Sequence, residues 1–463
     1  MTTEDDADAG RNEHSSAVRR YYERTPTSRE LNERARASMP GGSTRNATYT
    51  DPYPTYLVEG EGSRVVDEDG TEYVDFLNDY TTLVHGHAPE PVVERAVERV
   101  RRGAALGGAS RPQVEWAEHM VERSPAVEQI RFTNSGTEAT MNAVRAARAY
   151  TGNDLLAKFE GCYHGTHNDV QVSVDPPSHL AGPRAAPESV PESAGLPDSV
   201  TADVLTLPFN DPSATVDALE RHREDLAGVI VSPMMGSAVV PGTRAFVERL
   251  AGWTTEADVP LIFDEVISFR VAHGGAHDVY GVDPDLVTFG KIIGGGFPVG
   301  AFGGRADLMA GFDPSGGPDI THSGTFNANP ATAAAGLAAL EAYDADAVAR
   351  VNDLAADLVA RARDVIDDRG YRLQVTHRGS LFNLYCSATP LTDHRDVAAA
   401  HPDVERDLYF ELLDEGLWLS HSLLGCTSTA MDGGDVDAFV SGLDAALARL
   451  RPEVEARAPD LLA

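Results

Sequence analysis

Five short apolar runs alternate with helix-like stretches through the middle of the chain, and this alternation constrains the fold most strongly. The runs are IRFT, LLAKF, AGVIVSP, VPLIFDE and DLVTFG, between residues 130 and 290. Strands that are apolar on both faces are typical of parallel sheets covered by helices on each side. We therefore expect an α/β domain with a largely parallel, buried sheet.

The rest of the chain divides by composition. Residues 1–18 are polar and acidic, and we expect a disordered tail. An N-terminal segment, 19–80, contains SRVVDEDGTEYVDFL, whose alternation around an Asp-Gly pair predicts a β-hairpin. We place the large domain at 81–335 and a smaller α/β domain at 336–463. The smaller domain contains an Ala-rich helical stretch and a last amphipathic helix that begins near Asp435.

A proline-rich stretch interrupts the large domain between Asp175 and Pro197. It contains six prolines together with Ala, Ser and Gly. Proline disrupts the interior of a helix and removes a hydrogen bond from a central strand, so the stretch is predicted to be a long loop. Long loops are often functional, which makes an active-site lid one interpretation and a solvated insertion the other.

The balance of charge excludes several partners. The chain has 38 basic and 72 acidic side chains, and its formal net charge is −34 at pH 7. A nucleic-acid binder needs a basic footprint, and an anionic membrane surface repels an excess of acid. We therefore expect neither nucleic acid nor membrane as a partner. We interpret the charge as an adaptation to a very salty cytoplasm. The alternative is a protein that is acidic but works at an ordinary salt concentration.

The cysteines and the amino-terminal sequence indicate in which cellular compartment the protein works. Three cysteines, Cys162, Cys386 and Cys426, are too few and too widely spaced for a disulfide scaffold or a zinc ribbon. The sequence MTTEDDADAG lacks the basic and apolar regions of a signal peptide, and no uninterrupted apolar stretch reaches 18 residues. We expect a soluble protein of the cytoplasm.

Lysine is nearly absent from this chain. Only Lys158 and Lys291 occur among the 38 basic residues. Arginine matches the charge of lysine but is not deprotonated in proteins, so it cannot form an imine with a carbonyl group. Lys291 lies in DLVTFGKIIGGGFPVGAFGG, after a strand-like run and before a glycine-rich turn. We interpret Lys291 as a reactive amine, and the alternative is that it is an ordinary surface residue. For Lys158 we expect either a surface position or a local ion pair.

Asp264 and two further segments indicate a ligand site with this lysine. Asp264 ends a buried-strand pattern 27 residues before Lys291 (291 − 264 = 27), and ligands of open α/β sheets bind at the carboxyl ends of strands. The turn Ser135-Gly136-Thr137 opens a helix, whose start suits a phosphate dianion. FEGCYHG supplies Tyr163 and His164, an aromatic and an imidazole. Each of these observations also has a simpler explanation. Asp264 and Ser135 could serve only as helix caps, and Tyr163 could be a residue of the hydrophobic core.

Together these segments resemble a known family. NSGTEA, FEGCYHG, FDEV and FGKIIGGGFPVGAFGGR are similar, in order and spacing, to the class III aminotransferases, which are pyridoxal-phosphate enzymes of fold type I. They resemble most the branch of glutamate-1-semialdehyde aminomutase and its aminotransferase relatives. The similarity extends from about Met39 to Pro330 and continues more weakly beyond. It implies a large domain with a mostly parallel sheet, a smaller C-terminal domain, and pyridoxal 5'-phosphate as the cofactor.

The resemblance also implies a role for each motif residue. Lys291 would bind the cofactor as an internal aldimine and move a proton, and Asp264 would pair with the pyridinium nitrogen. Tyr163 would stack on one face of the ring, beside His164, and Val266 would pack on the other face. The phosphate contacts would come from Ser135, Gly136 and Thr137, and from Gly324 and Thr325 of the partner subunit. A homodimer with shared active sites is therefore implied.

An arginine is implied to bind the substrate. The segment PGGSTR, residues 40–45, aligns with the part of the family that ends in an arginine for the substrate carboxylate. Arg45 is then the candidate, because a planar guanidinium binds a carboxylate through two hydrogen bonds. With 36 arginines in the chain, an unrelated surface arginine is the alternative.

Departures from the aminomutase pattern bear on the reaction. VSPMMGSAVV has Ser232 and Ser237 where the aminomutase has an acid before the proline and an Asn-rich segment after it, and DEVISFR is one residue shorter than its counterpart. We therefore favour transfer of an amino group between an amino acid (α, β or ω) and a 2-oxo acid. The alternative is glutamate-1-semialdehyde 2,1-aminomutase, in which the transfer is intramolecular.

Two other classes are considered. A nucleotide-dependent dehydrogenase is suggested by GGGFPVGAFGG, but the G-x-G-x-x-G turn with a following acid is missing. A non-catalytic relative that only binds the cofactor is disfavoured by Lys291 and Asp264, which both remain. We also expect no metal ion in the site.

The charge predicts how stability depends on salt. Self-repulsion of a net charge of −34 destabilises the folded chain, and molar salt screens it because the Debye length falls to about 3 Å. We expect the melting temperature to rise with KCl concentration, which thermal melts at several concentrations measure. A melting temperature that stays flat or falls as KCl rises would contradict the salt interpretation.

Overall fold

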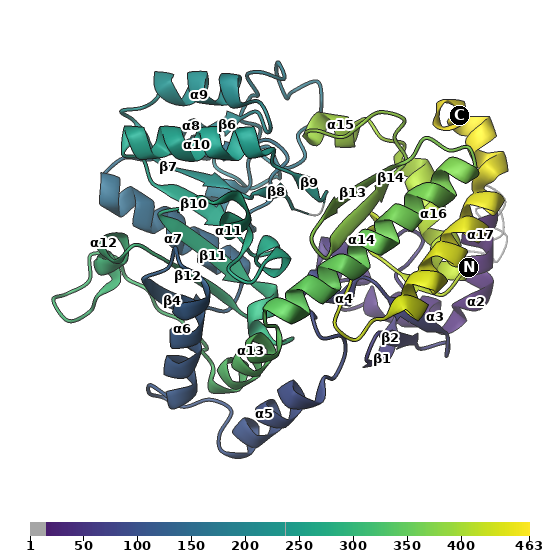
Figure 1. Cartoon of the computed structure of the whole chain (residues 1–463), viewed down its shortest axis with the longest axis horizontal. Coiled ribbons are helices and arrows are strands. Elements are labelled where there is room, and N and C mark those ends of the chain that lie inside the picture. Colours follow the sequence, from purple (N-terminus) through teal and green to yellow (C-terminus); the bar gives the residue numbers. More distant parts are fainter. Residues whose placement is uncertain (1–14, 237) are drawn as a thin grey trace.

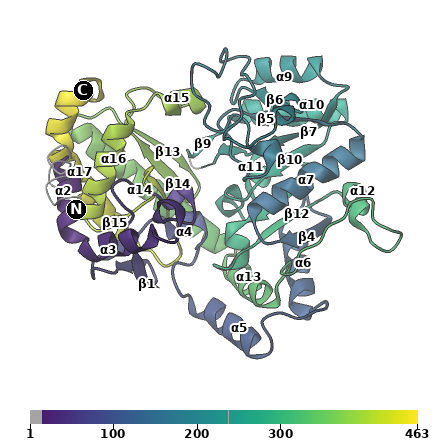
Figure 2. The same cartoon turned by 180° about the vertical axis from the view of Figure 1, so that it is seen from behind.

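The computed structural model describes residues 15–236 and 238–463, which form two domains (Figures 1 and 2). The large domain is built on a seven-stranded sheet of order β4-β12-β11-β10-β7-β5-β6. Its strands are β4 (Gln129–Thr133), β5 (Leu155–Phe159), β6 (Val204–Leu207), β7 (Leu226–Val231), β10 (Leu261–Asp264), β11 (Leu286–Gly290) and β12 (Gly300–Gly304). Neighbouring strands from β6 to β11 are parallel, and β12 is antiparallel to both of its neighbours. The predicted α/β domain is confirmed.

Helices cover both faces of this sheet. Helix α7 crosses one face and contacts five of the strands, and α9 packs beside α10. Helix α13 is apolar on nearly every side and lies buried against α5 and α6, which explains its Ala-rich sequence. The helices are α5 (Glu90–Arg101), α6 (Arg111–Arg123), α7 (Gly136–Thr151), α9 (Pro212–Arg221), α10 (Arg244–Ala257) and α13 (Pro330–Ala342). Short elements connect them, namely α8 (Asp198–Ala202), β8 (Met234–Met235), β9 (Val240–Pro241), α11 (Ala276–Tyr280) and α12 (Ala306–Met309).

The small domain is a three-stranded antiparallel sheet with long helices packed against it. Its strands have the order β13-β14-β16. Helices α14 and α17 pack together, and α17 also contacts α16. The elements are α14 (Ala345–Asp368), β13 (Gln374–Arg378), β14 (Leu381–Tyr385), α15 (His394–Ala398), α16 (Pro402–Asp414), β15 (Leu417–Trp418), β16 (Leu424–Cys426) and α17 (Gly433–Arg457). The helix that the sequence predicts from about Asp435 is α17.

The N-terminal segment packs on the small domain. Helices α2 (Ser16–Arg24) and α3 (Pro26–Ala35) precede strand β1 (Leu57–Glu61) and the hairpin of β2 (Arg64–Asp67) and β3 (Glu72–Asp75). The predicted hairpin is confirmed, because β2 and β3 pair antiparallel. Strand β15 then adds to β3 in parallel, and α2 lies against α16. One hydrophobic core contains residues from α2 near the start and from α17 near the end of the described chain. The purple and yellow ribbons of these segments lie close together in Figures 1 and 2.

Two predicted boundaries differ from the structure. Residues 1–14 of the predicted tail lie outside the described residues, but α2 begins at Ser16, capped by the Ser15 side chain, so the last residues of the tail are helical. The predicted division at 335/336 falls inside α13, which packs against α5 and α6 of the large domain. We therefore propose that the small domain begins with α14.

The proline-rich stretch is a long loop, as predicted. Between Asp175 and Pro197 the chain forms no helix, and a single β-bridge joins Val172 to Pro191. Within residues 15–236 and 238–463, every helix is too short or too polar to serve as a membrane span.

A buried carboxyl group of the small domain gives a pH-dependent prediction. Burial raises the pKa of Glu405 from 4.5 to about 7, and its Oε1 accepts a hydrogen bond from the Cys386 backbone N–H at 3.0 Å. The unfolded chain therefore releases this proton at a lower pH than the folded chain does. The group lowers stability as pH rises from 4.5 to 7, by roughly 3 kcal/mol at most. Glutamine keeps an acceptor without the charge.

We expect Glu405→Gln to raise the melting temperature at pH 8 and to leave it nearly unchanged at pH 4.5. Thermal melts of both chains at the two pH values measure this difference. An equal change at both pH values would show that ionisation of Glu405 is not the cause.

Candidate active site

A cavity of about 470 Å³ lies at the carboxyl ends of the central strands. Asp264 ends β10, Lys291 directly follows β11, and Ser135 follows β4 and caps α7. The lining residues are Arg45, Asp79, Thr82, Asn134, Ser135, Gly136, Thr137, Tyr163, His164, Gly165, Ser232, Gly236, Asp264, Val266, Ile267, Lys291, Gly296, Phe297, Pro298 and Val299. The cavity therefore brings together the predicted residues from segments that are far apart in the sequence.

Asp264 is fixed in orientation by three neighbours. Its Oδ1 accepts hydrogen bonds from the Thr288 hydroxyl at 2.9 Å and from the Val266 backbone N–H at 3.1 Å. Its Oδ2 lies 2.7 Å from Nδ1 of His164. Burial lowers the pKa of His164, so the neutral ring donates its Nδ1–H to the carboxylate. Asp264 is thus a buried carboxylate whose direction is set by strand β11 and by His164.

The start of α7 forms a cradle without bulky side chains. Ser135 caps the helix by accepting a hydrogen bond from the Glu138 backbone N–H at 3.2 Å. The first N–H groups of a helix have no acceptor within it, so those of Gly136 and Thr137 are available to a ligand in the cavity. A Cβ on Gly165 would lie 2.6 Å from Oγ1 of Thr137. Glycine is therefore required for this close approach, and the cradle fits an anion such as phosphate.

An aromatic and an aliphatic side chain line the cavity, Tyr163 and Val266. Tyr163 is half exposed and lines the cavity just before His164. Val266 packs close to two glycines, since a Cβ on Gly136 or Gly290 would lie 3.0 to 3.1 Å from its methyl groups. An aromatic ring and a branched aliphatic group are suited to enclose a flat heterocycle.

Lys291 presents its amine in a desolvated position. Its Nζ donates a hydrogen bond to the Tyr80 backbone carbonyl at 2.9 Å. Burial lowers the pKa of Lys291; Arg45 also lowers it, whereas the Asp79 and Asp264 carboxylates act in the opposite direction. A lowered pKa increases the fraction of neutral amine, which is the nucleophilic form.

The carbonyl that faces Lys291 belongs to a left-handed turn, α4 (Asn78–Thr81). Its four residues have φ angles of 49°, 47°, 53° and 73°, although none is glycine. Left-handed helical backbone costs about 1–2 kcal/mol per residue without glycine, so other contacts must hold the turn in place. Oδ1 of Asp75 accepts hydrogen bonds from the backbone N–H groups of Leu77 and Asn78. Lys291 also has a positive φ, 49°.

Arg45 lies at the cavity in contact with this turn. It pairs with Asp79 at 3.3 Å, and its guanidinium lies 5.1 Å from the centre of the Tyr80 ring. Both charged side chains are about half exposed, so the pair contributes little stability. Arg45 and Asp79 also line a neighbouring cavity of about 330 Å³. Arg45 thus lies where the two cavities meet, in an exposed ion pair with Asp79.

The structure leaves two predicted residues outside this cavity. Gly324 and Thr325 lie in an exposed loop before α13 and are not among the lining residues. The resemblance assigns them to the site of the partner subunit. Sequence reasoning missed Asp79, because no glycine marks the left-handed turn on which it lies. Ser232 lines the cavity, and Ser237 lies outside the described residues.

Lys158 occupies neither of the places considered for it. It is fully buried on β5, and its Nζ donates hydrogen bonds to the backbone carbonyls of Phe159 and Val172. Among the described residues no carboxylate lies within ion-pair distance of it. Burial lowers its pKa to about 8. The surface and ion-pair interpretations of Lys158 were therefore wrong.

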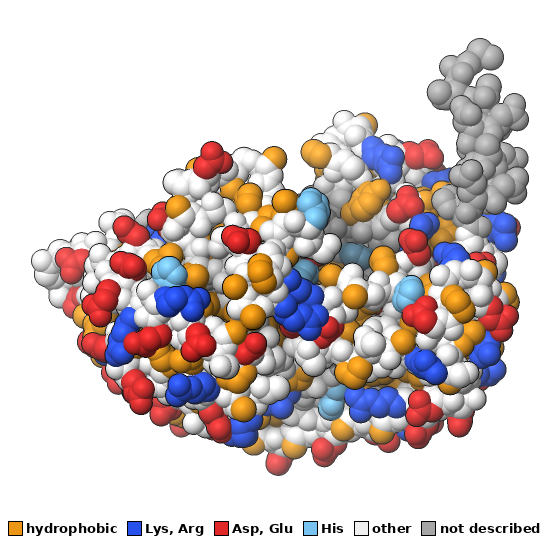
Figure 3. Space-filling model, turned by 90° about the horizontal axis from the view of Figure 1, so that it is seen from above, with side chains coloured by type: hydrophobic (Ala, Val, Ile, Leu, Met, Phe, Trp, Pro, Cys, Tyr) orange, Lys and Arg blue, Asp and Glu red, His pale blue; other side chains and the backbone are white. Residues whose placement is uncertain are grey.

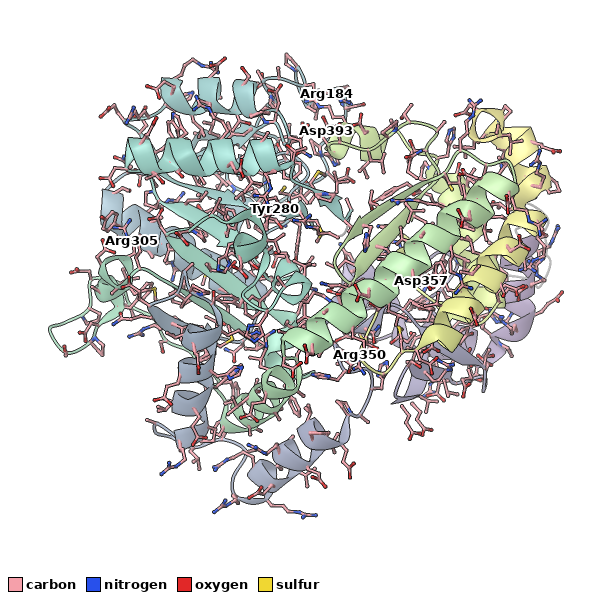
Figure 4. The ribbon with its side chains drawn as sticks, in the orientation of Figure 1. Arg184, Tyr280, Arg305, Arg350, Asp357 and Asp393 are labelled. Atoms are coloured by element: carbon pink, nitrogen blue, oxygen red, sulfur yellow. The ribbon has the colours of Figure 1, made fainter. Side chains whose placement is uncertain are left out.

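The proline-rich loop joins the two domains. None of the lining residues of the cavity comes from 175–197. Arg184 on this loop pairs with Asp393 and Asp396 at α15, and Figure 4 shows Arg184 beside Asp393. Arg395 binds Glu160 through two nitrogens and also donates to loop carbonyls. These contacts hold the loop against α15, away from the cavity. They support a role in joining the domains, and they do not support the interpretation of the loop as a lid.

These features define the class of the protein. The chain belongs to the class III aminotransferase family, which it matches over residues 46–423. The resemblance drawn from the motifs is thereby confirmed, together with the fold of this class. Because the chain belongs to this family, the interpretation as a nucleotide-dependent dehydrogenase is wrong.

Three proteins are similar to the chain over most of its length. Glutamate-1-semialdehyde 2,1-aminomutase of Methanopyrus kandleri is 41% identical over 405 residues, which cover 87% of this chain and 92% of that protein. An omega-transaminase from Sphaerobacter thermophilus is 42% identical, with a TM-score of 0.89 over 92% of this chain and 98% of that one. A glutamate-1-semialdehyde-aminomutase variant from Pseudomonas aeruginosa PAO1, in complex with PMP, is 26% identical, with a TM-score of 0.84 over 94% and 97%.

Proposed function

We propose that this chain transfers an amino group between an amine carbon and a carbonyl carbon, with pyridoxal phosphate bound in the 470 Å³ cavity. One observation carries the proposal: the Lys291 amine, the Asp264 carboxylate and the anion cradle of α7 line the same cavity. Bound pyridoxal phosphate supplies an electron sink for the carbon that carries the amine.

The residues of the cavity fit this cofactor. The cradle at Gly136 and Thr137 would bind the phosphate through backbone N–H groups. Asp264 would face the ring nitrogen and keep it protonated, in the orientation fixed by Thr288 and His164. Tyr163 and Val266 would enclose the ring, which also excludes water from its faces.

Lys291 would join the cofactor covalently and later move a proton at its Nζ. Desolvation favours the neutral amine needed for attack on a carbonyl group. When the amine is protonated, the Tyr80 carbonyl accepts a hydrogen bond from it. Arginine could not take this place, because its guanidinium remains protonated.

Arg45 would bind the substrate carboxylate. Its guanidinium lines the cavity, and within residues 15–236 and 238–463 its ion pair is with the half-exposed Asp79 at 3.3 Å. A carboxylate that displaces Asp79 would gain a charge-assisted contact without having to break a buried ion pair. This supports a substrate with a carboxylate group.

For the reaction, we propose intramolecular transfer first. The curated relative from Methanopyrus kandleri is named glutamate-1-semialdehyde 2,1-aminomutase and matches 87% of this chain. That name favours the aminomutase, which the departures in VSPMMGSAVV had placed second. Both reactions use the same lysine, aspartate and phosphate cradle, and they differ in whether the carbonyl product leaves the site.

Transfer between two molecules is the second candidate. It is favoured by the omega-transaminase from Sphaerobacter thermophilus, which has a higher TM-score and a higher identity than the aminomutase structure, 0.89 against 0.84 and 42% against 26%. An amino acid and a 2-oxo acid would then be the two substrates.

We propose a homodimer with shared active sites. Val93, Val97 and Val100 form an exposed apolar row on α5, which projects from the body in Figures 1 and 2. Phe297 is exposed near this row and also lines the cofactor cavity. A second copy that covers the row would therefore reach the cavity. The exposed loop with Gly324 and Thr325 would serve the site of that copy.

The setting that we propose is a salty cytoplasm. The net charge of −34 requires screening, and acidic side chains are spread over the face shown in Figure 3. The three cysteines are free and buried, as in proteins of a reducing compartment.

One assay decides between the two reactions. Purified protein with pyridoxal phosphate is given glutamate 1-semialdehyde alone, and separately α- and β-amino acids with 2-oxoglutarate or pyruvate. We expect 5-aminolevulinate from the semialdehyde alone, and no product from Lys291→Ala. Amino transfer in the second set, with no product from the semialdehyde, would establish the two-molecule reaction instead.

A further inference from the structure

Arg270 is a buried cation whose hydrogen-bond acceptors are all neutral. It lies in the short helix η4 (Ser268–Val271), a few residues after Asp264, and is fully buried. Nη1 donates to the Thr81 carbonyl and Nε to the Ser380 hydroxyl, each at 2.8 Å, and Nη2 donates to the Thr427 carbonyl. In the part of the chain that the structure describes, Arg270 forms no ion pair. A buried charge without an anion is unfavourable, so its role requires an explanation.

The three acceptors belong to separate parts of the fold. Thr81 ends the left-handed turn of residues 78–81. Ser380 directly precedes β14 and Thr427 directly follows β16, so both belong to the small domain. Arg270 itself follows β10 of the large domain. One guanidinium therefore joins the turn to both domains.

The turn is anchored at its two ends. At the start, Oδ1 of Asp75 accepts hydrogen bonds from Leu77 and Asn78, and at the end Arg270 holds the Thr81 carbonyl. Between these anchors lies Tyr80, whose carbonyl accepts from Nζ of Lys291. Four non-glycine residues with positive φ do not keep this conformation by themselves.

We propose that Arg270 is a positioning residue for Lys291. By holding the Thr81 carbonyl, it fixes the left-handed turn and so places the Tyr80 carbonyl against the lysine amine. The proposal rests on the proposed function, in which that amine joins pyridoxal phosphate. Arg270 does not line the cofactor cavity, so it acts only through the turn.

Loss of Arg270 has a predictable effect on the amine. Without its anchor the turn relaxes and the Tyr80 carbonyl moves away, so the protonated amine loses its acceptor and deprotonates at a lower pH. The groups that set the pKa of Lys291 besides burial, namely Asp79, Arg45, Cys426 and Asp264, remain in the chain. Removal of a positive charge alone would raise the pKa of the amine. A downward shift therefore identifies the hydrogen bond as the cause.

The test measures how the full chain, stripped of cofactor, takes up pyridoxal phosphate as a function of pH. Only the neutral amine reacts, so the rate at which the visible absorption band appears follows the titration of Lys291. We expect Arg270→Met to lower the midpoint of this profile by about one pH unit relative to the unmutated chain.

Arg123→Met is the matched control. Arg123 is also a buried arginine and donates to the carbonyls of His273, Leu340 and Tyr343, but it does not touch the turn. We expect this variant to lose stability and to keep the midpoint of the unmutated chain. If Arg270→Met keeps that midpoint as well, Arg270 is only structural and the proposal is overturned.

A milder variant covers the case in which Arg270→Met does not fold. Ser380→Ala removes one acceptor and leaves the charge in place, and we expect a smaller shift in the same direction; an unchanged midpoint would contradict the proposal. If the unmutated chain itself gains no visible band, the proposed function fails instead. The two failures are therefore distinguishable.

Discussion

The hydrogen bond from Lys291 to the Tyr80 carbonyl is the contact on which the candidate site depends. It holds a desolvated amine at the end of β11, in the same cavity as Asp264 and the start of α7. Both sides of the bond have strained backbone, with positive φ at Lys291 and throughout residues 78–81. Such strain persists only where the surrounding structure holds it, and here Asp75 and Arg270 do so.

Much of the large domain could be predicted because its signals are local. Apolar runs with neighbouring helices indicate a parallel sheet, and such a sheet places the residues after its strands at one edge. Lys291 and Asp264 could be found for this reason. The hairpin of β2 and β3 could be predicted from an alternating pattern around an Asp-Gly turn.

The remaining features depend on contacts between distant segments. Nothing local in the sequence shows that β15 pairs with β3, or that α13 packs with the large domain. The left-handed turn has no glycine to mark it, so Asp79 and the Tyr80 carbonyl could not be predicted. Lys158 was misplaced because its acceptors are backbone carbonyls, which leave no pattern in the sequence.

The site accounts for the chemistry that the two candidate reactions share. An amine, a ring-facing carboxylate and an anion cradle are needed whether the amino group moves within one molecule or between two. The difference must lie in how long the carbonyl product stays. Arg45 and Asp79 lie where the cofactor cavity meets a second cavity, and the proposed binding of a substrate carboxylate by Arg45 would displace Asp79 from this pair.

The most direct test uses the two lysines of the chain. Protein saturated with pyridoxal phosphate is reduced with borohydride, digested and mapped by mass spectrometry. The account predicts that the cofactor is attached at Lys291 and that Lys158, buried in β5, carries none. Cofactor-saturated protein in which Lys291 is unmodified would contradict it.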